Sequence, residues 1–185
     1  MKNYIESLNQ TLSKLPFDII DDIIQVLVKA NKEDKQIFVF GNGGSAGTAS
    51  HFITDLGKGS SDKLQKRFRC MSLNDNTAWI TAIGNDYSYE DIFLRQLQNY
   101  AKPGDVVITM SVSGNSPNLI KAFKWAKAEG LVTVALVGGK KGGLATIAEH
   151  VAIIDSEHYG LVEDAHMVIS HILCYAFMEH PELTN

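Results

Sequence analysis

Cysteine is scarce in this chain, which excludes a small scaffold held together by disulfide bonds. Only two of the 185 residues are cysteines, Cys70 and Cys174. Each lies in an apolar stretch, within residues 68–73 and 172–177. We therefore expect two reduced thiols in the core and no disulfide framework.

Long hydrophobic runs and an excess of positive charge are also missing. No uninterrupted apolar stretch approaches the length of a membrane span, and residues 1–6 lack the apolar core of a signal peptide. Lys and Arg number 17 against 21 Asp and Glu, a net charge of −4, and only residues 63–69 are locally basic. That segment is interpreted as a solvated loop, or alternatively as a flap facing a phosphate or substrate. We expect a cytoplasmic protein with no membrane and no nucleic-acid partner.

Strands and helices alternate along most of the chain, without repeats, low-complexity tracts or linkers. Two amphipathic helices separated near Pro16 come first. Apolar runs then predict strands near 36–41, 68–73, 105–110, 131–137 and 151–154. Helices are predicted near 45–56, 76–84, 89–100, 117–128, 143–148 and 160–179. Strands that are apolar throughout are typical of parallel sheets covered on both faces.

The predicted fold class is therefore α/β, a three-layer α/β/α sandwich with a five-stranded parallel sheet. We expect one domain over residues 1–185, with a helical part at 1–34 and an α/β core at 35–185. The first two helices could cover the sheet or pack against a second subunit. We favour subunit packing, because the other helices suffice to cover both faces.

Two loops of small residues follow predicted strands and open predicted helices. One is Gly41-Asn42-Gly43-Gly44-Ser45, and the other runs from Ser111 through Ser113 to Ser116. Unpaired N–H groups and the helix dipole make such turns suitable for an anion, which at the edge of a parallel sheet suggests a phosphorylated small molecule. Glycine–serine turns also close strands without a ligand, and Ser116 could simply cap the helix 117–127. Neither loop is a Walker or dinucleotide-binding loop.

Titratable residues gather on two of the predicted helices. His51 and Asp55 are four positions apart on one helix, and Glu163, His166 and His171 lie on the last one. Such residues could bind a divalent metal, zinc suiting these ligands, or could move protons on a sugar phosphate. Alternatively, the histidines are packing residues, Asp55 pairs with a nearby lysine, and Glu163 favours the helix dipole.

With these motifs in this order, the chain resembles the sugar isomerase (SIS) domain superfamily, and within it the phosphoheptose isomerase group. The resemblance extends to about residue 180 and includes both small-residue loops and the last-helix segment from Glu163 to His171. It also rests on four further segments, residues 81–87, 91–93, 104–107 and 135–139. It implies a flavodoxin-like sheet and an aldose–ketose isomerase that converts sedoheptulose 7-phosphate to D-glycero-D-manno-heptose 7-phosphate or handles a related sugar phosphate.

The resemblance also implies roles for individual residues. It implies one zinc ion per subunit. It also implies a homo-oligomer, a tetramer whose sites lie between subunits, and the two amino-terminal helices of this chain fit such an assembly. Asp55 and His171 would be the acid/base pair, and His51, Asp55, Glu163 and His171 the zinc ligands. The sugar phosphate would be bound by Asn42, Gly43, Gly44, Ser45, Asp86, Ser111, Ser113 and Ser116.

The chain departs from the family pattern at five positions. Asp55 replaces Glu, Glu163 replaces Gln, Val112 replaces a hydroxyl residue, Gly59 replaces Arg and Gly160 replaces Asp. The two altered carboxylates and Gly160 favour an alternative, a noncatalytic SIS protein that senses a phosphosugar or binds another protein, like the branch associated with the DnaA initiator. The presence of both His51 and His171 favours the enzyme.

Overall fold

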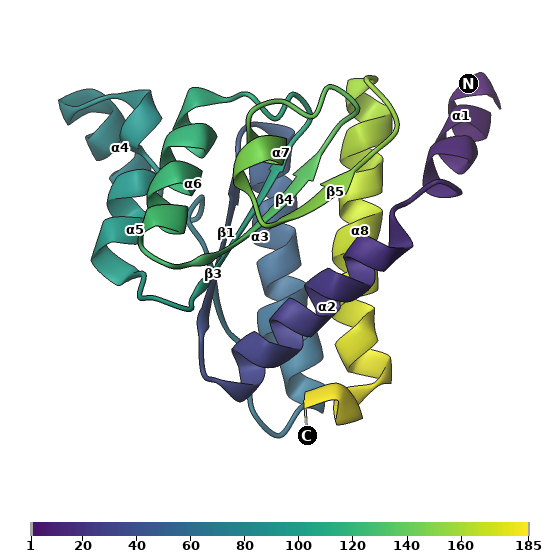
Figure 1. The fold of residues 1–185 in the computed structure, drawn as a ribbon, viewed down its shortest axis with the longest axis horizontal. Helices are drawn as coiled ribbons and strands as arrows, with labels where there is room; N and C mark the ends of the chain where they lie inside the picture. Colours follow the sequence, from purple (N-terminus) through teal and green to yellow (C-terminus); the bar gives the residue numbers. More distant parts are fainter. Residues whose placement is uncertain (1, 185) are drawn as a thin grey trace.

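A single parallel sheet forms the centre of the computed structural model, which describes residues 2–184. Its order is β2-β1-β3-β4-β5, as in flavodoxin-like folds (Figure 1). The strands are β1 (Gln36–Gly41), β2 (Arg69–Ser72), β3 (Val106–Ser111), β4 (Val132–Val137) and β5 (His150–Ile153). The order reverses between β1 and β3, so the loops after these two strands leave the sheet side by side.

Helices connect the strands and precede the first one. The α-helices are α1 (Lys2–Leu12), α2 (Phe17–Lys32), α3 (Gly44–Thr54), α4 (Thr77–Asp86), α5 (Leu94–Tyr100), α6 (Pro117–Ala128), α7 (Leu144–Ile147) and α8 (Tyr159–Glu179). A π-helical turn, η1 (Asp55–Ser60), continues α3 and leads into the 3₁₀ turn η2 (Ser61–Lys63). Two further 3₁₀ turns are η3 (Tyr89–Asp91) and η4 (Pro181–Thr184).

Two hydrophobic clusters cover the two faces of the sheet. Alternate strand residues point to opposite faces, so Val39 and Ile108 pack with α2, α3 and α8, whereas Phe40 and Val107 pack with α5, α6 and α7. Figure 1 shows α2, α3 and α8 together on one side of the strands. The predicted α/β/α sandwich with five parallel strands is confirmed, and every predicted strand and helix is present within a few residues.

Helix α8 is long and apolar enough to cross a membrane by length and composition alone. Half of its most apolar stretch is buried inside the fold, however, as expected for a core helix. Its Cys174 is buried and Cys70 on β2 is half-buried, and both are free thiols, as predicted. Burial raises the pKa of Cys174 to about 12 and that of Cys70 to about 11, so neither is a reactive thiolate.

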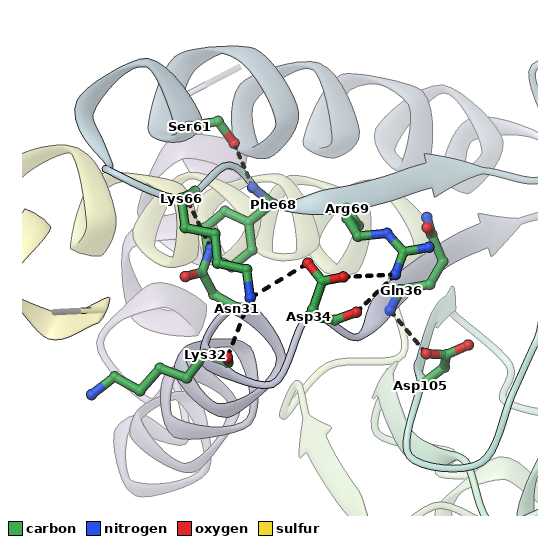
Figure 2. A network of polar contacts seen from close by, with 9 residues as sticks. All are labelled: Asn31, Lys32, Asp34, Gln36, Ser61, Lys66, Phe68, Arg69 and Asp105. Carbon is green, nitrogen blue, oxygen red and sulfur yellow. Dashed lines mark hydrogen bonds and ion pairs between the residues drawn. The ribbon is translucent and has the colours of Figure 1, made fainter.

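The basic segment 63–69 forms ion pairs at the amino edge of the sheet. Lys66 Nζ and Arg69 Nη1 lie 3.4 and 3.2 Å from the carboxylate of Asp34 (Figure 2). The Arg67 side chain contacts Asp62 at 2.9 Å. Arg69 begins β2, at the end of the strand opposite to the small-residue loops. In the described chain this segment is thus a structural link between α2 and β2, and it does not face the small-residue loops.

Candidate active site

The loops after β1 and β3 meet at the carboxyl edge of the sheet. The amide groups of Asn42 and Asn118 join them through two reciprocal hydrogen bonds of 2.9 Å each. Tyr89 Oη also donates to Asn42 Oδ1, at 3.1 Å. These contacts hold the starts of α3 and α6 next to each other, which is where ligands bind in open parallel sheets.

The turn between β3 and α6 directs hydroxyl groups into the space between the loops. Ser111 Oγ accepts from the N–H of Gly114 at 3.1 Å, and Ser113 Oγ accepts from the N–H of Asn115 at 3.2 Å. Ser116 is the N-cap of α6 with Pro117 following, yet its side chain forms no capping hydrogen bond. The capping role considered from the sequence is therefore absent, and the Ser116 hydroxyl is available to a ligand.

A cleft of about 270 Å³ lies between the two loops and the start of α8. Tyr159 and Glu163 of α8 and Met110 of β3 contribute to its walls. Seven of the residues predicted to bind the sugar phosphate line it: Asn42, Gly43, Gly44, Ser45, Ser111, Ser113 and Ser116. The eighth, Asp86, lies at the end of α4 in a different pocket with Trp79 and Arg95, so one chain does not bring it to this cleft.

Three of the four predicted metal ligands converge at the other end of α3. His51 Nε2 lies 3.1 Å from His171 Nε2 and 3.1 Å from Asp55 Oδ2, and His171 Nε2 lies 3.8 Å from the same oxygen. All three side chains are partly open to solvent, between 29 and 47% exposed. They form a group that could hold a metal ion.

The donor set fits zinc. Ligand atoms 2.0–2.1 Å from a tetrahedral ion are separated by about 3.3 Å, close to the spacing of these two nitrogens and one oxygen. Two imidazoles and one carboxylate also match the ligands of catalytic zinc sites, which keep a fourth position open. Glu163 is not part of this group. Its carboxylate lies against Gly44, because eight residues of α8 separate it from His171 by about 12 Å along the helix axis.

The π-helical turn η1 fixes the position of Asp55, its first residue. Ser60 Oγ donates to the carbonyl of Cys174 at 3.0 Å, which ties the turn to the helix that carries His171. Ser61 Oγ donates to the carbonyl of Leu56 at 2.9 Å, and both serines are buried. The helix predicted from the sequence ends near residue 56, and no hydrophobic period in the segment that follows indicates a π-turn. Such turns occur often at functional sites.

Several residues near the site were not predicted from the sequence. Asn118 bridges the two loops, Tyr159 lines the cleft and Tyr89 contacts Asn42.

His166, which the sequence grouped with His171, is 1% exposed and lies outside the three-residue group. Its ring nitrogens have no hydrogen-bond partner within residues 2–184, and burial lowers its pKa to about 4.

Comparisons with known proteins place this geometry in a family. The model of the SIS domain matches residues 3–138. The probable phosphoheptose isomerase of Thermoplasma volcanium is 39% identical over 174 residues, which cover 94% of this chain and 88% of the relative. The phosphoheptose isomerase of Clostridium acetobutylicum is 36% identical over 184 residues, covering 94% and 93%.

Solved structures agree with this result. A phosphoheptose isomerase from Francisella tularensis superposes with a TM-score of 0.89 at 26% identity, covering 96% of both chains. The phosphoheptose isomerase GmhA from Neisseria gonorrhoeae has a TM-score of 0.87 at 26% identity and the same coverage. The chain belongs to the SIS domain family, in its phosphoheptose isomerase group.

Proposed function

We propose that this protein is a phosphosugar isomerase that interconverts sedoheptulose 7-phosphate and D-glycero-D-manno-heptose 7-phosphate. One observation carries the proposal: the same two helices, α3 and α8, join the cleft between the small-residue loops to a His/Asp/His group. Relatives named phosphoheptose isomerases, similar over nearly the whole chain, support the substrate.

The spacing along the two helices suits a sugar phosphate of this length. Gly44 and His51 are seven residues apart on α3, which places them about 10 Å apart along the helix axis. An extended seven-carbon chain has a comparable length. A phosphate held by Ser111, Ser113, Ser116 and the loop at residues 42–45 would therefore place the carbonyl end of the sugar near His171 and Asp55.

The reaction moves two protons and needs no external oxidant. Asp55 or His171 removes a proton from C1 of the ketose while the other residue supplies a proton to the C2 carbonyl oxygen, which gives an enediol. Return of a proton to C2 and loss of the O1 proton then form the aldose. Asp86 remains our proposal for binding sugar hydroxyls, from a neighbouring subunit.

Zinc is the metal we propose for the His/Asp/His group. His51, Asp55 and His171 would hold it, with Glu163 as a fourth ligand only if its carboxylate turns away from Gly44. A zinc ion bound there would supply a Lewis acid next to the sugar carbonyl.

Assembly and location complete the proposal. We infer a homotetramer with sites between subunits, which is supported by exposed apolar side chains on α1 and by α4. Helix α4 buries none of its residues within one chain although it contains Trp79, Ile80 and Ile83. We infer a cytoplasmic location, which the free thiols of both cysteines support.

The test is turnover of sedoheptulose 7-phosphate in deuterated buffer, with and without added zinc. The parent should form the aldose and incorporate solvent deuterium next to the carbonyl, as followed by NMR. His171→Ala and Asp55→Asn should each lower this exchange by at least a hundredfold, because positioned acid/base groups contribute roughly 10²–10⁴-fold. Asp55→Glu, which restores the reach of the family residue, should retain activity.

His180→Ala is the matched control, since His180 lies at the exposed end of α8 and pairs with Glu182. Its exchange rate should equal that of the parent. A parent chain that binds the sugar phosphate without any exchange, or an unaffected His171→Ala variant, would contradict the enzyme and favour the noncatalytic alternative.

A further inference from the structure

Glu163 places a carboxylate in the cleft that otherwise presents hydroxyls and N–H groups. It lines this cleft together with the three serines of the β3–α6 turn. A Cβ built on Gly44 would lie 2.7 Å from Glu163 Oε1 and 3.3 Å from Oε2. The carboxylate thus lies directly against the first residue of α3, and a larger residue at position 44 would require the flexible Glu163 side chain to shift.

This placement makes the two helix starts unequal. The start of α3 already has a negative group beside it, which its dipole and unpaired N–H groups favour. The start of α6 has no acidic residue in its first turn and presents the free hydroxyl of Ser116. A ligand phosphate is therefore directed toward the β3–α6 turn, within the cleft that the loop at residues 42–45 also lines.

No cationic side chain among the described residues pairs with this carboxylate. Among the ion pairs formed by residues 2–184, none involves Glu163. A second anionic group entering the cleft would meet an uncompensated negative charge within a few ångströms. A hydroxyl group at the same place would instead donate a charge-assisted hydrogen bond to it.

We propose that Glu163 is a specificity-determining residue that selects ligands carrying one phosphate next to a neutral hydroxyl. The phosphate binds at Ser111–Ser116, and the adjoining hydroxyl donates to the Glu163 carboxylate. Phosphorylated ligands with a carboxylate at that position are rejected. The inference rests on the proposed function, since it assumes that the cleft binds the phosphate end of the substrate.

Two small probes that differ at the position next to the phosphorylated carbon test this role. Glycerol 3-phosphate has a hydroxyl group there, whereas 2-phosphoglycolate has a carboxylate there. Calorimetry with the full chain should give at least about tenfold tighter binding of glycerol 3-phosphate, since one like-charge contact in such a site is worth a factor of ten or more. Glu163→Gln, which keeps the shape and removes the charge, should reduce this ratio by about tenfold.

Glu179→Gln is the charge-matched control, because Glu179 is exposed at the far end of the same helix. This variant should keep the parent's ratio of the two probe affinities. Glu163→Asp, which keeps the negative charge, should still bind glycerol 3-phosphate more tightly than the second probe. A ratio that Glu163→Gln leaves unchanged would overturn the role of Glu163 alone. A parent chain that binds neither probe would overturn the phosphate site of the proposed function together with this inference.

Discussion

At the scale of single residues, His51, Asp55 and His171 define the reactive end of the site. The backbone at each of these positions belongs to a regular helical element. His51 lies on α3, Asp55 is the first residue of a π-turn, and His171 lies on a half-buried core helix. Their donor atoms lie within 4.8 Å of one another. The group is therefore preorganised for a metal or for proton transfer.

Removal of one imidazole should weaken metal binding. We expect about one zinc ion per parent chain, and at least tenfold weaker zinc affinity for His51→Ala, because the variant keeps only two of the three donors. Zinc titration against a competing chelator, with elemental analysis of untagged protein, measures both quantities. His158→Ala is the control, since His158 caps the start of α8. Equal zinc affinity of parent and His51→Ala would rule out this site.

Two departures from the family pattern lie where neighbouring side chains pack closely against the backbone. A side chain at Gly59 would collide with the end of Met178, and a Cβ on Gly160 would lie 2.7 Å from Tyr4 Oη. Tyr4 in turn donates a hydrogen bond to Asp164 at 2.7 Å. The space that larger residues need at these positions is thus filled by neighbouring side chains, and both glycines belong to the packing of α8 against η1 and α1.

At the scale of secondary-structure elements, the start of α6 makes a prediction that separates binding from stability. Ser113→Ala/Ser116→Ala should weaken binding of inorganic phosphate by at least tenfold, because two hydroxyl donors are lost at the helix start. The melting temperature should stay close to that of the parent, since Ser116 forms no capping bond. Calorimetry and thermal unfolding check the two halves, with Ser13→Ala on the exposed α1–α2 connection as control. Unchanged phosphate affinity would contradict the assignment.

The sheet could be predicted from the sequence because its strands are buried on both faces. β1 and β4 are largely apolar runs, and such runs are typical of parallel strands covered on both faces. The loops after β1 and β3 could likewise be placed at one edge, since parallel strands end together. Pairing of His51 with His171 could not follow from local pattern, because 120 residues separate them. It entered through the family resemblance.

Other features depend on packing that no sequence period reveals. The π-turn after α3 is held by buried serines that bond to distant or local carbonyls. Glu163 points toward Gly44 because of how α8 packs against α3. The sequence does not reveal this packing, and Glu163 was therefore grouped with the metal ligands. Asp86 lies at the end of α4, which has no buried residue within one chain. Within one chain it lines a pocket separate from the cleft.

At the scale of the whole molecule, His166 makes the stability of the fold depend on pH. The side chain is 1% exposed, without a hydrogen-bond partner for either nitrogen within the described chain, and burial lowers its pKa from 6.5 to about 4. The folded state thus holds a neutral imidazole, whereas the unfolded chain takes up a proton near pH 6.5. Between these pKa values the unfolded state binds more protons, so the free energy of unfolding falls as the pH is lowered.

Replacing His166 should remove this dependence. A pKa lowered from 6.5 to about 4 corresponds to about 3 kcal/mol of stability, which is lost progressively between about pH 6.5 and pH 4 and does not change further below that. Urea unfolding of the parent and of His166→Met at intervals from pH 7.5 to 4 gives the difference between their free energies of unfolding. This difference should move by about 3 kcal/mol in favour of the variant as the pH falls, whatever cavity or packing cost the variant has at pH 7.5. His180→Ala, which changes an exposed histidine, should give a curve parallel to that of the parent, and a parallel curve for His166→Met would show that His166 does not set the acid sensitivity of the fold.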